Sequence, residues 1–211
     1  MILIGQYDSP FVRRVGIALT LYGHVFEHRP WSTFGQGDMI APFNPLRRVP
    51  TLILDDGSVI IESAYMLDWL DEQAGEAALI ARTGALRQKA LYLVALSTGM
   101  ADKAVSLFYE QMLHEEASDL WLTRCRTQIG GVLDVLERER AAADGPWFFG
   151  ESLSHADVAL GCALNFCREA HRDQFDWSPW PALADHGARC EALDVFRAIS
   201  QPFIPPSRNP D

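Results

Sequence analysis

The chain has few cysteines, and their spacing suits neither a disulfide framework nor a metal site. All of them lie in the second half, without CxxC spacing and without histidine pairs at zinc-ligand intervals. We therefore expect reduced thiols in the core or on the surface, and no metal. The four cysteines are Cys125, Cys162, Cys167 and Cys190.

Basic residues are also scarce. Lys and Arg number 18 against 28 Asp and Glu, which gives a formal net charge of -10 at pH 7. Such a chain has no overall positive field to attract nucleic acid or an anionic membrane. The N-terminal stretch MILIGQYDSP has no basic region, and no apolar run approaches membrane-spanning length. These absences predict a cytoplasmic protein with no nucleic-acid partner and no membrane partner.

The composition that remains is that of a soluble globular protein. Hydrophobic residues make up 48% of the chain and charged residues 22%. A length of 211 residues is comfortable for two domains, so we looked for a change of pattern along the chain.

The two halves of the chain differ in periodicity. The first half alternates strand and helix patterns, whereas after about residue 82 only long helical patterns occur. We predict an α/β domain of the order βαβ-ββα, with an irregular stretch at 32–45, followed by an all-helical domain. The tail from Gln201 is too rich in proline to continue a helix, and the sequence leaves open whether it folds back. The predicted boundaries are 1–76 for the first domain, 77–84 for a linker and 85–211 for the second domain.

Two helix starts have residues suited to capping. Ser9 stands before Pro10, and serine at the N-cap with proline at the first helical position is a favoured helix start. Ser154 is followed three residues later by Asp157, which predicts a capping box and a helix from near His155.

Three motifs together resemble the cytosolic glutathione transferase superfamily, in particular its serine-type bacterial members. They are YDSPFVRRV, NPLRRVPTLILDDGSVIIES and GESLSHADVAL, and with the two-part pattern they cover nearly the whole chain. The resemblance implies a thioredoxin-like N-terminal domain that binds glutathione as co-substrate. It also implies an all-helical domain that shapes the pocket for a small hydrophobic electrophile, a role in detoxification, and a homodimer.

The resemblance assigns the glutathione site to the second motif. In relatives the bond before the proline is cis, so Val49 before Pro50 would pair through its backbone with the cysteinyl part of glutathione. Ser63 and the first N-H groups of the following helix would bind the γ-glutamyl carboxylate, and Glu62 the amino group. Arg47 or Arg48 would hold the glycyl carboxylate, and the sequence does not choose between them.

The resemblance gives the catalytic role to a hydroxyl at the first turn. Ser9 would donate a hydrogen bond to the glutathione thiolate, and Tyr7 is the rival, because tyrosine has this role in other classes. No cysteine lies near this turn, which argues against the members that form mixed disulfides with glutathione. Arg13, one turn into the helix, is expected to be a salt-bridge partner on the helix surface and to have a supporting role.

Apolar side chains are candidates for the electrophile pocket, although core packing explains each of them equally well. They are Phe11, Trp31, Phe34, Phe108, Tyr109 and Met112.

The predicted function is conjugation of glutathione to small apolar electrophiles. A glutathione-dependent isomerase or peroxidase is an alternative, and a non-catalytic ligand- or partner-binding protein on the same fold is another. Isomerases of the maleylacetoacetate type usually have a serine-serine-cysteine run at the first turn, from which Asp8-Ser9-Pro10 departs.

Overall fold

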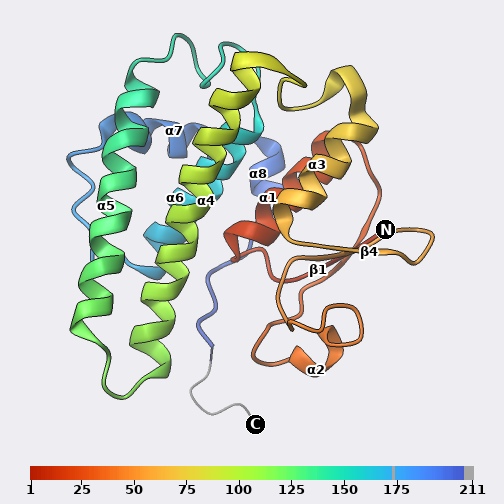
Figure 1. Cartoon of the computed structure of the whole chain (residues 1–211), viewed down its shortest axis with the longest axis horizontal. Coiled ribbons are helices and arrows are strands. Elements are labelled where there is room, and N and C mark those ends of the chain that lie inside the picture. Colours follow the sequence, from red (N-terminus) through yellow and green to blue (C-terminus); the bar gives the residue numbers. More distant parts are fainter. Residues whose placement is uncertain (173, 207–211) are drawn as a thin grey trace. The chain divides into compact units, whose positions relative to one another are not determined.

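The structure is a computed structural model that describes residues 1–172 and 174–206 (Figure 1). The chain divides into two compact units. The N-terminal unit comprises Met1–Ala78 together with Asp194–Asp211, and the helical unit comprises Leu79–Leu193. This division differs from the predicted domains at the C-terminus, because the segment from Asp194 onward belongs with the N-terminal residues.

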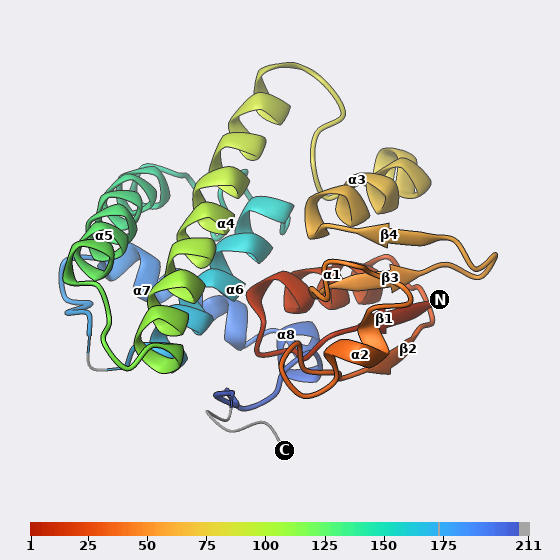
Figure 2. The same ribbon diagram turned by 60° about the horizontal axis from the view of Figure 1, so that its bottom comes forward.

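The N-terminal unit is built on a four-stranded sheet of order β2-β1-β3-β4. β1 pairs with β2 in parallel and with β3 antiparallel, and β3 and β4 form an antiparallel hairpin. Figure 1 shows α1 and α3 on one side of this sheet and α2 on the other, and Figure 2 shows the strands from a second direction. The elements are β1 (Ile2–Ile4), α1 (Pro10–Leu21), β2 (Glu27–Arg29), α2 (Gly37–Ile40), β3 (Thr51–Ile53), β4 (Val59–Ile61), α3 (Ser63–Ala74), the 3-10 helix η1 (Gly75–Ala77) and α8 (Asp194–Ala198).

Local sequence explains the hairpin between β3 and β4. Gly57 has a φ of 85°, a conformation that glycine adopts without cost, and its N-H donates to the carbonyl of Leu54. Asp56 accepts hydrogen bonds from the backbone and the hydroxyl of Ser58. Asp, Gly and Ser are residues that favour such turns.

The sequence predicted that the stretch at 32–45 is irregular, but part of it is helical. It contains the short helix α2, which places Ile40 in the core with Ile4 and Ile53. One apolar turn is too short for a helical period to be visible among the surrounding glycines and prolines.

The second unit is entirely helical. Its α6 begins at His155 as predicted, with both hydrogen bonds of the capping box between Ser154 and Asp157 present. The four cysteines are free and buried, as expected of core thiols. The α/β unit with an added all-helical unit confirms the predicted fold class. The helices are α4 (Gly84–Leu113), α5 (Asp119–Ala141), α6 (His155–Ala170) and α7 (Pro181–Glu191).

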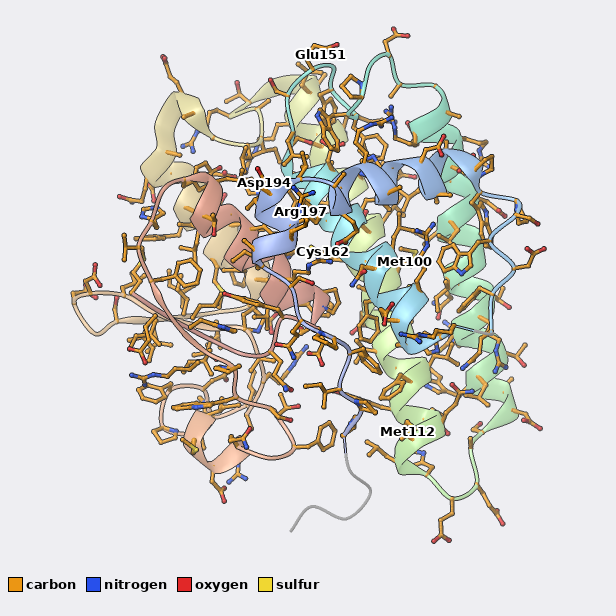
Figure 3. All side chains as sticks on the ribbon, turned by 180° about the vertical axis from the view of Figure 1, so that it is seen from behind. Met100, Met112, Glu151, Cys162, Asp194 and Arg197 are labelled. Atoms are coloured by element: carbon orange, nitrogen blue, oxygen red, sulfur yellow. The ribbon has the colours of Figure 1, made fainter. Side chains whose placement is uncertain are left out.

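The helix α4 is longer and more apolar than the sequence reading allowed. By length and composition alone it is sufficient to cross a membrane, contrary to our expectation that no segment would be. Within the helical unit it packs against α5 and α6, and Ser97 and Met100 in its middle are completely buried. Figure 3 shows Met112 near the C-terminal end of this helix.

Candidate functional site

The first turn of the N-terminal unit positions Ser9. This residue is the N-cap of α1, with extended backbone angles, and its Oγ accepts from the N-H of Val12 at 3.4 Å. Its own N-H donates to the carbonyl of Gln6 at 3.1 Å, which closes the turn. The predicted cap is thus confirmed, with Pro10 at the first helical position. The hydroxyl proton has no acceptor among the hydrogen bonds of the described residues, so Ser9 is able to donate to a ligand.

Tyr7, the rival hydroxyl, is packed inside the N-terminal unit. Its ring stacks on that of His28 with 3.8 Å between centroids, and it is 9% exposed. Burial raises the pKa of Tyr7 to about 12, so its hydroxyl is a weaker acid than an ordinary tyrosine. A serine hydroxyl is a still weaker acid, so this shift alone does not decide between Ser9 and Tyr7 as the donor to a thiolate.

The C-terminal segment folds back onto this turn. The N-H of Tyr7 donates to Oε1 of Gln201 at 2.8 Å, and the N-H of Ile204 donates to Oδ2 of Asp8 at 3.0 Å. Burial raises the pKa of Asp8 above its usual value, although hydrogen bonds from the backbone partly offset this. The question that the sequence left open is answered for residues 201–206, and residues 207–211 lie outside the described part of the chain.

Arg13 anchors the same segment and is buried, not on the helix surface as we expected. It is 2% exposed, and its Nε and Nη2 donate to the carbonyls of Ile199 and Phe196 at 2.8 and 2.9 Å. Its guanidinium also lies over the Phe196 ring. Figure 3 shows Asp194 and Arg197, which form an ion pair within α8.

Val49 and Pro50 lie at the entrance to β3, and the bond between them is cis, as the resemblance implied. No partner is found for the backbone N-H and C=O of Val49 in residues 1–172 and 174–206. Both groups therefore remain for an extended ligand. Buried Asn44 holds the preceding loop, because its Nδ2 donates to the carbonyl of Arg48 at 2.9 Å and to Oγ1 of Thr51 at 3.1 Å.

A glycine allows Val49 to approach the first turn. Gly5 has a φ of 130°, and a Cβ at this position would lie 2.8 Å from Cβ of Val49 and 2.5 Å from Cγ2 of Val12. The end of β1, the start of α1 and the cis bond therefore meet at a point where only glycine fits.

The start of α3 lies at the end of β4. Glu62 occupies the N-cap position with a φ of 66°, an unusual value for a residue other than glycine, and its side chain makes no capping hydrogen bond. Ser63 is therefore the first helical residue of α3 and not its N-cap. Its side chain is buried, and its Oγ accepts from Nη2 and Nε of Arg14 at 2.8 and 3.1 Å.

The two neighbouring arginines turn to different partners. Arg48 lies 3.5 Å from the carboxylate of Glu62, whereas Arg47 lies 2.9 Å from that of Asp38 at the start of α2. All four side chains are largely exposed, so these ion pairs contribute little to stability.

The aromatic and methionine candidates are distributed over both units. Trp31 packs on the cluster around Ile40 and under the Arg29 guanidinium, and Phe34 is exposed. On α4, Phe108 is buried against the ring of His171. Their assignment to one electrophile pocket stays a prediction, as it does for Phe11, Tyr109 and Met112, which are half-buried.

Comparison with known proteins identifies the family. The model of the glutathione S-transferase N-terminal domain matches residues 3–78, and that of the C-terminal domain matches residues 119–189. The GST-like protein YibF of Escherichia coli is 30% identical over 174 residues, which are 81% of this chain and 85% of that protein. The chain belongs to the glutathione S-transferase family. The superfamily recognised from the three motifs is thereby confirmed.

Two further glutathione S-transferase relatives are similar over nearly their whole length. A crystal structure of a glutathione S-transferase from Methylobacterium radiotolerans, in complex with glutathione sulfonate, superposes with a TM-score of 0.87 at 28% identity. That match covers 96% of this chain and 97% of the other. Maleylpyruvate isomerase from Ralstonia sp is 28% identical in an alignment of 223 positions, gaps included, that covers 100% of this chain and 99% of that protein.

Sequence reasoning missed several residues that shape this candidate site. Gly5, Asn44 and Arg14 were assigned no role, and Gln201 was only part of a tail of open conformation. An Asn-Pro pair and a glycine after a strand were visible signals for the first two. Arg14 and Gln201 act on partners distant in sequence, for which no local pattern exists. Among the residues described, no cluster of histidine, cysteine or acidic side chains is suited to hold a metal ion.

Proposed function

We propose that this protein conjugates the thiolate of glutathione to small apolar electrophiles. The observation that carries the proposal is the Ser9 hydroxyl, which caps α1 while its proton remains available to a ligand. The same compact unit contains the cis Val49–Pro50 bond and the start of α3 at Ser63. The relative crystallised with glutathione sulfonate supports glutathione as the co-substrate.

We infer that glutathione lies extended across the ends of these elements. Its cysteinyl backbone pairs with the free N-H and C=O of Val49, in the manner of a short added strand. Its γ-glutamyl carboxylate meets the N-H groups and hydroxyl at the start of α3, where the helix dipole favours an anion. Glu62 accepts from the amino group, and the thiol is then directed toward Ser9.

The glycyl carboxylate is best assigned to Arg47. Arg48 is paired with Glu62, which belongs to the γ-glutamyl end of the proposed ligand, whereas Arg47 faces α2 through Asp38. Because the Arg47–Asp38 pair is exposed, exchanging Asp38 for a ligand carboxylate costs little.

The contribution of Ser9 to the rate is modest by this mechanism. A free thiol with a pKa of about 8.5 is only about 3% thiolate at pH 7. Lowering its pKa by roughly two units raises the thiolate fraction about 25-fold. The lower nucleophilicity of a less basic thiolate, with a Brønsted slope of about 0.4–0.5, leaves a net factor of about three. Most of the acceleration must come from holding the electrophile against the sulfur.

Titration calorimetry with glutathione, followed by turnover of a panel of electrophiles by wild type and Ser9→Ala, tests the proposal. We expect binding of glutathione, a higher pKa of the bound thiol in Ser9→Ala from its thiolate absorbance, and a loss of turnover. Absence of binding at millimolar glutathione would refute the function. If Ser9→Ala leaves the thiol pKa and the turnover unchanged, a donor other than Ser9 stabilises the thiolate.

Isomerisation is a second candidate, supported by the full-length similarity to maleylpyruvate isomerase. Such a reaction uses glutathione transiently and returns it, so the two functions are separated by the fate of the thiol. Loss of free thiol during turnover indicates conjugation, whereas a constant thiol concentration with a consumed cis-diacid substrate indicates isomerisation. A cytoplasmic location and a role in detoxification remain predictions.

We also propose a homodimer. In the N-terminal unit, Leu46 and Tyr65 are 58% and 69% exposed, and large apolar side chains of this kind suit a protein interface. Sedimentation at several protein concentrations gives the oligomeric state. A monomer at all concentrations would contradict this proposal.

A further inference from the structure

Ser63 is held by a buried charge from the neighbouring helix. Arg14, on α1, is 3% exposed, and Ser63, on α3, is 5% exposed. The guanidinium of Arg14 donates twice to the same oxygen, from Nη2 at 2.8 Å and from Nε at 3.1 Å. Two helices that are far apart in sequence are thus joined at the one hydroxyl that the proposed site uses for an anion.

This pair of hydrogen bonds fixes what the hydroxyl is able to do. A serine oxygen has two acceptor lone pairs and one proton to donate. Arg14 occupies both lone pairs, so Ser63 is left as a donor only. A donor whose oxygen is already hydrogen-bonded to a cation is suited to a carboxylate, because such chains of hydrogen bonds polarise one another.

The backbone around Ser63 supports the same use. Glu62 adopts a φ of 66° and provides no side-chain cap to α3, a helix of 12 residues. In the described part of the chain, the N-H groups of Ser63 and Ala64 have no acceptor. A strained residue at the start of an uncapped helix is typical of a binding site.

We propose that Arg14 is a positioning residue for glutathione, which orients the Ser63 hydroxyl toward the γ-glutamyl carboxylate and adds positive charge behind it. The inference rests on the proposed function and deepens it. Arg14 acts through Ser63 and does not itself contact the ligand.

The test compares two ligands by titration calorimetry. The first is glutathione, and the second is 4-aminobutanoyl-cysteinyl-glycine, which lacks only the γ-glutamyl carboxylate. In the wild type we expect glutathione to bind about tenfold or more tighter than the analogue, the effect of one hydrogen bond to a charged group. Arg14→Met and Ser63→Ala should each weaken glutathione binding and reduce this ratio to about threefold or less. In the double variant the ratio should fall no further, because the two residues act as one.

Two further variants separate positioning from folding. Arg14→Lys retains the charge with a smaller perturbation but cannot donate twice in a fixed geometry, so we expect an intermediate ratio. Arg13→Lys is the matched control, because Arg13 is equally buried on the same helix but donates to the carbonyls of Phe196 and Ile199. It should lose stability and keep the wild-type ratio.

The outcomes distinguish the inference from the function. If the wild type binds neither ligand, the proposed function fails. If it binds glutathione and Arg14→Met and Arg14→Lys keep the wild-type ratio, only the role of Arg14 is overturned. An equal loss of affinity for both ligands in these variants would also overturn it, because Arg14 would then merely join α1 to α3.

Discussion

Replacing Arg13 with methionine tests how the C-terminal segment is held on the N-terminal unit. In the wild type the guanidinium is enclosed by the protein and donates to two backbone carbonyls, those of Phe196 and Ile199. Methionine fills a similar length of space but donates no hydrogen bond. The two carbonyls would be left without this donor in a site from which water is largely absent.

The size of the effect follows from these two bonds. A hydrogen bond to a charged group contributes about 1.5–3 kcal/mol, so two give at least about 3 kcal/mol. Removing a buried cation also removes its desolvation cost, which offsets part of this loss. We expect a net decrease of about 2–4 kcal/mol in the free energy of unfolding. For a chain of this size the melting temperature would fall by about 5–10 °C.

Hydrogen exchange distinguishes local from global loss. If the C-terminal segment detaches while the rest stays folded, the loss of stability cannot exceed the free energy that holds the segment in place. In that case the amides of Tyr7 and Ile204 lose protection from exchange first. Urea unfolding gives the global value, and Arg13→Lys is a milder variant. A decrease below about 0.5 kcal/mol in Arg13→Met, with unchanged exchange of these amides, would refute the reasoning.

Three further predictions follow. Gly5→Ala should lower the free energy of unfolding, measured in urea, by about 2–5 kcal/mol, because the added Cβ clashes and the φ is strained for alanine. Gly57→Ala has open space around it and should lower this free energy by only about 1 kcal/mol. Equal decreases in the two variants would contradict this prediction. Burial lowers the pKa of His171, so below about pH 6.5 the unfolded chain binds a proton that the folded protein does not. The free energy of unfolding should therefore decrease as the pH is lowered, by up to about 1.4 kcal/mol per pH unit. The slope between pH 7 and 5 should be smaller in His171→Gln, and an unchanged slope would contradict the assignment. Arg47→Ala should weaken glutathione binding more than binding of γ-glutamylcysteine, which lacks the glycyl carboxylate, while Arg48→Ala should affect both ligands alike. The reverse result would assign the glycyl carboxylate to Arg48.

Features that depend on neighbours in sequence were predictable. The cap at Ser9 and the box from Ser154 to Asp157 each require only residues within one helical turn, and the structure has both. The hairpin turn was visible for the same reason. The βαβ-ββα order also followed, because alternation and helical period are local patterns.

Features that depend on distant partners were not predictable. Arg13 and Arg14 are adjacent in sequence and equally charged, yet one binds carbonyls near the C-terminus and the other binds Ser63. Nothing within a helical turn distinguishes them, and Arg13 was expected on the surface because arginine is rarely buried without a partner. The N-cap position of α3 was also missed, since the positive φ of Glu62 breaks the usual rule for that residue type.

The return of the chain's end to the N-terminal unit has a consequence for synthesis and dissection. Residues 1–78 leave the ribosome long before Phe196 and Ile199 exist, so Arg13 has none of these carbonyl partners while the helical unit is being made. A fragment ending at Ala78 should therefore be less stable than the same residues in the whole chain. Adding residues 194–206 as a separate peptide would be expected to restore part of that stability.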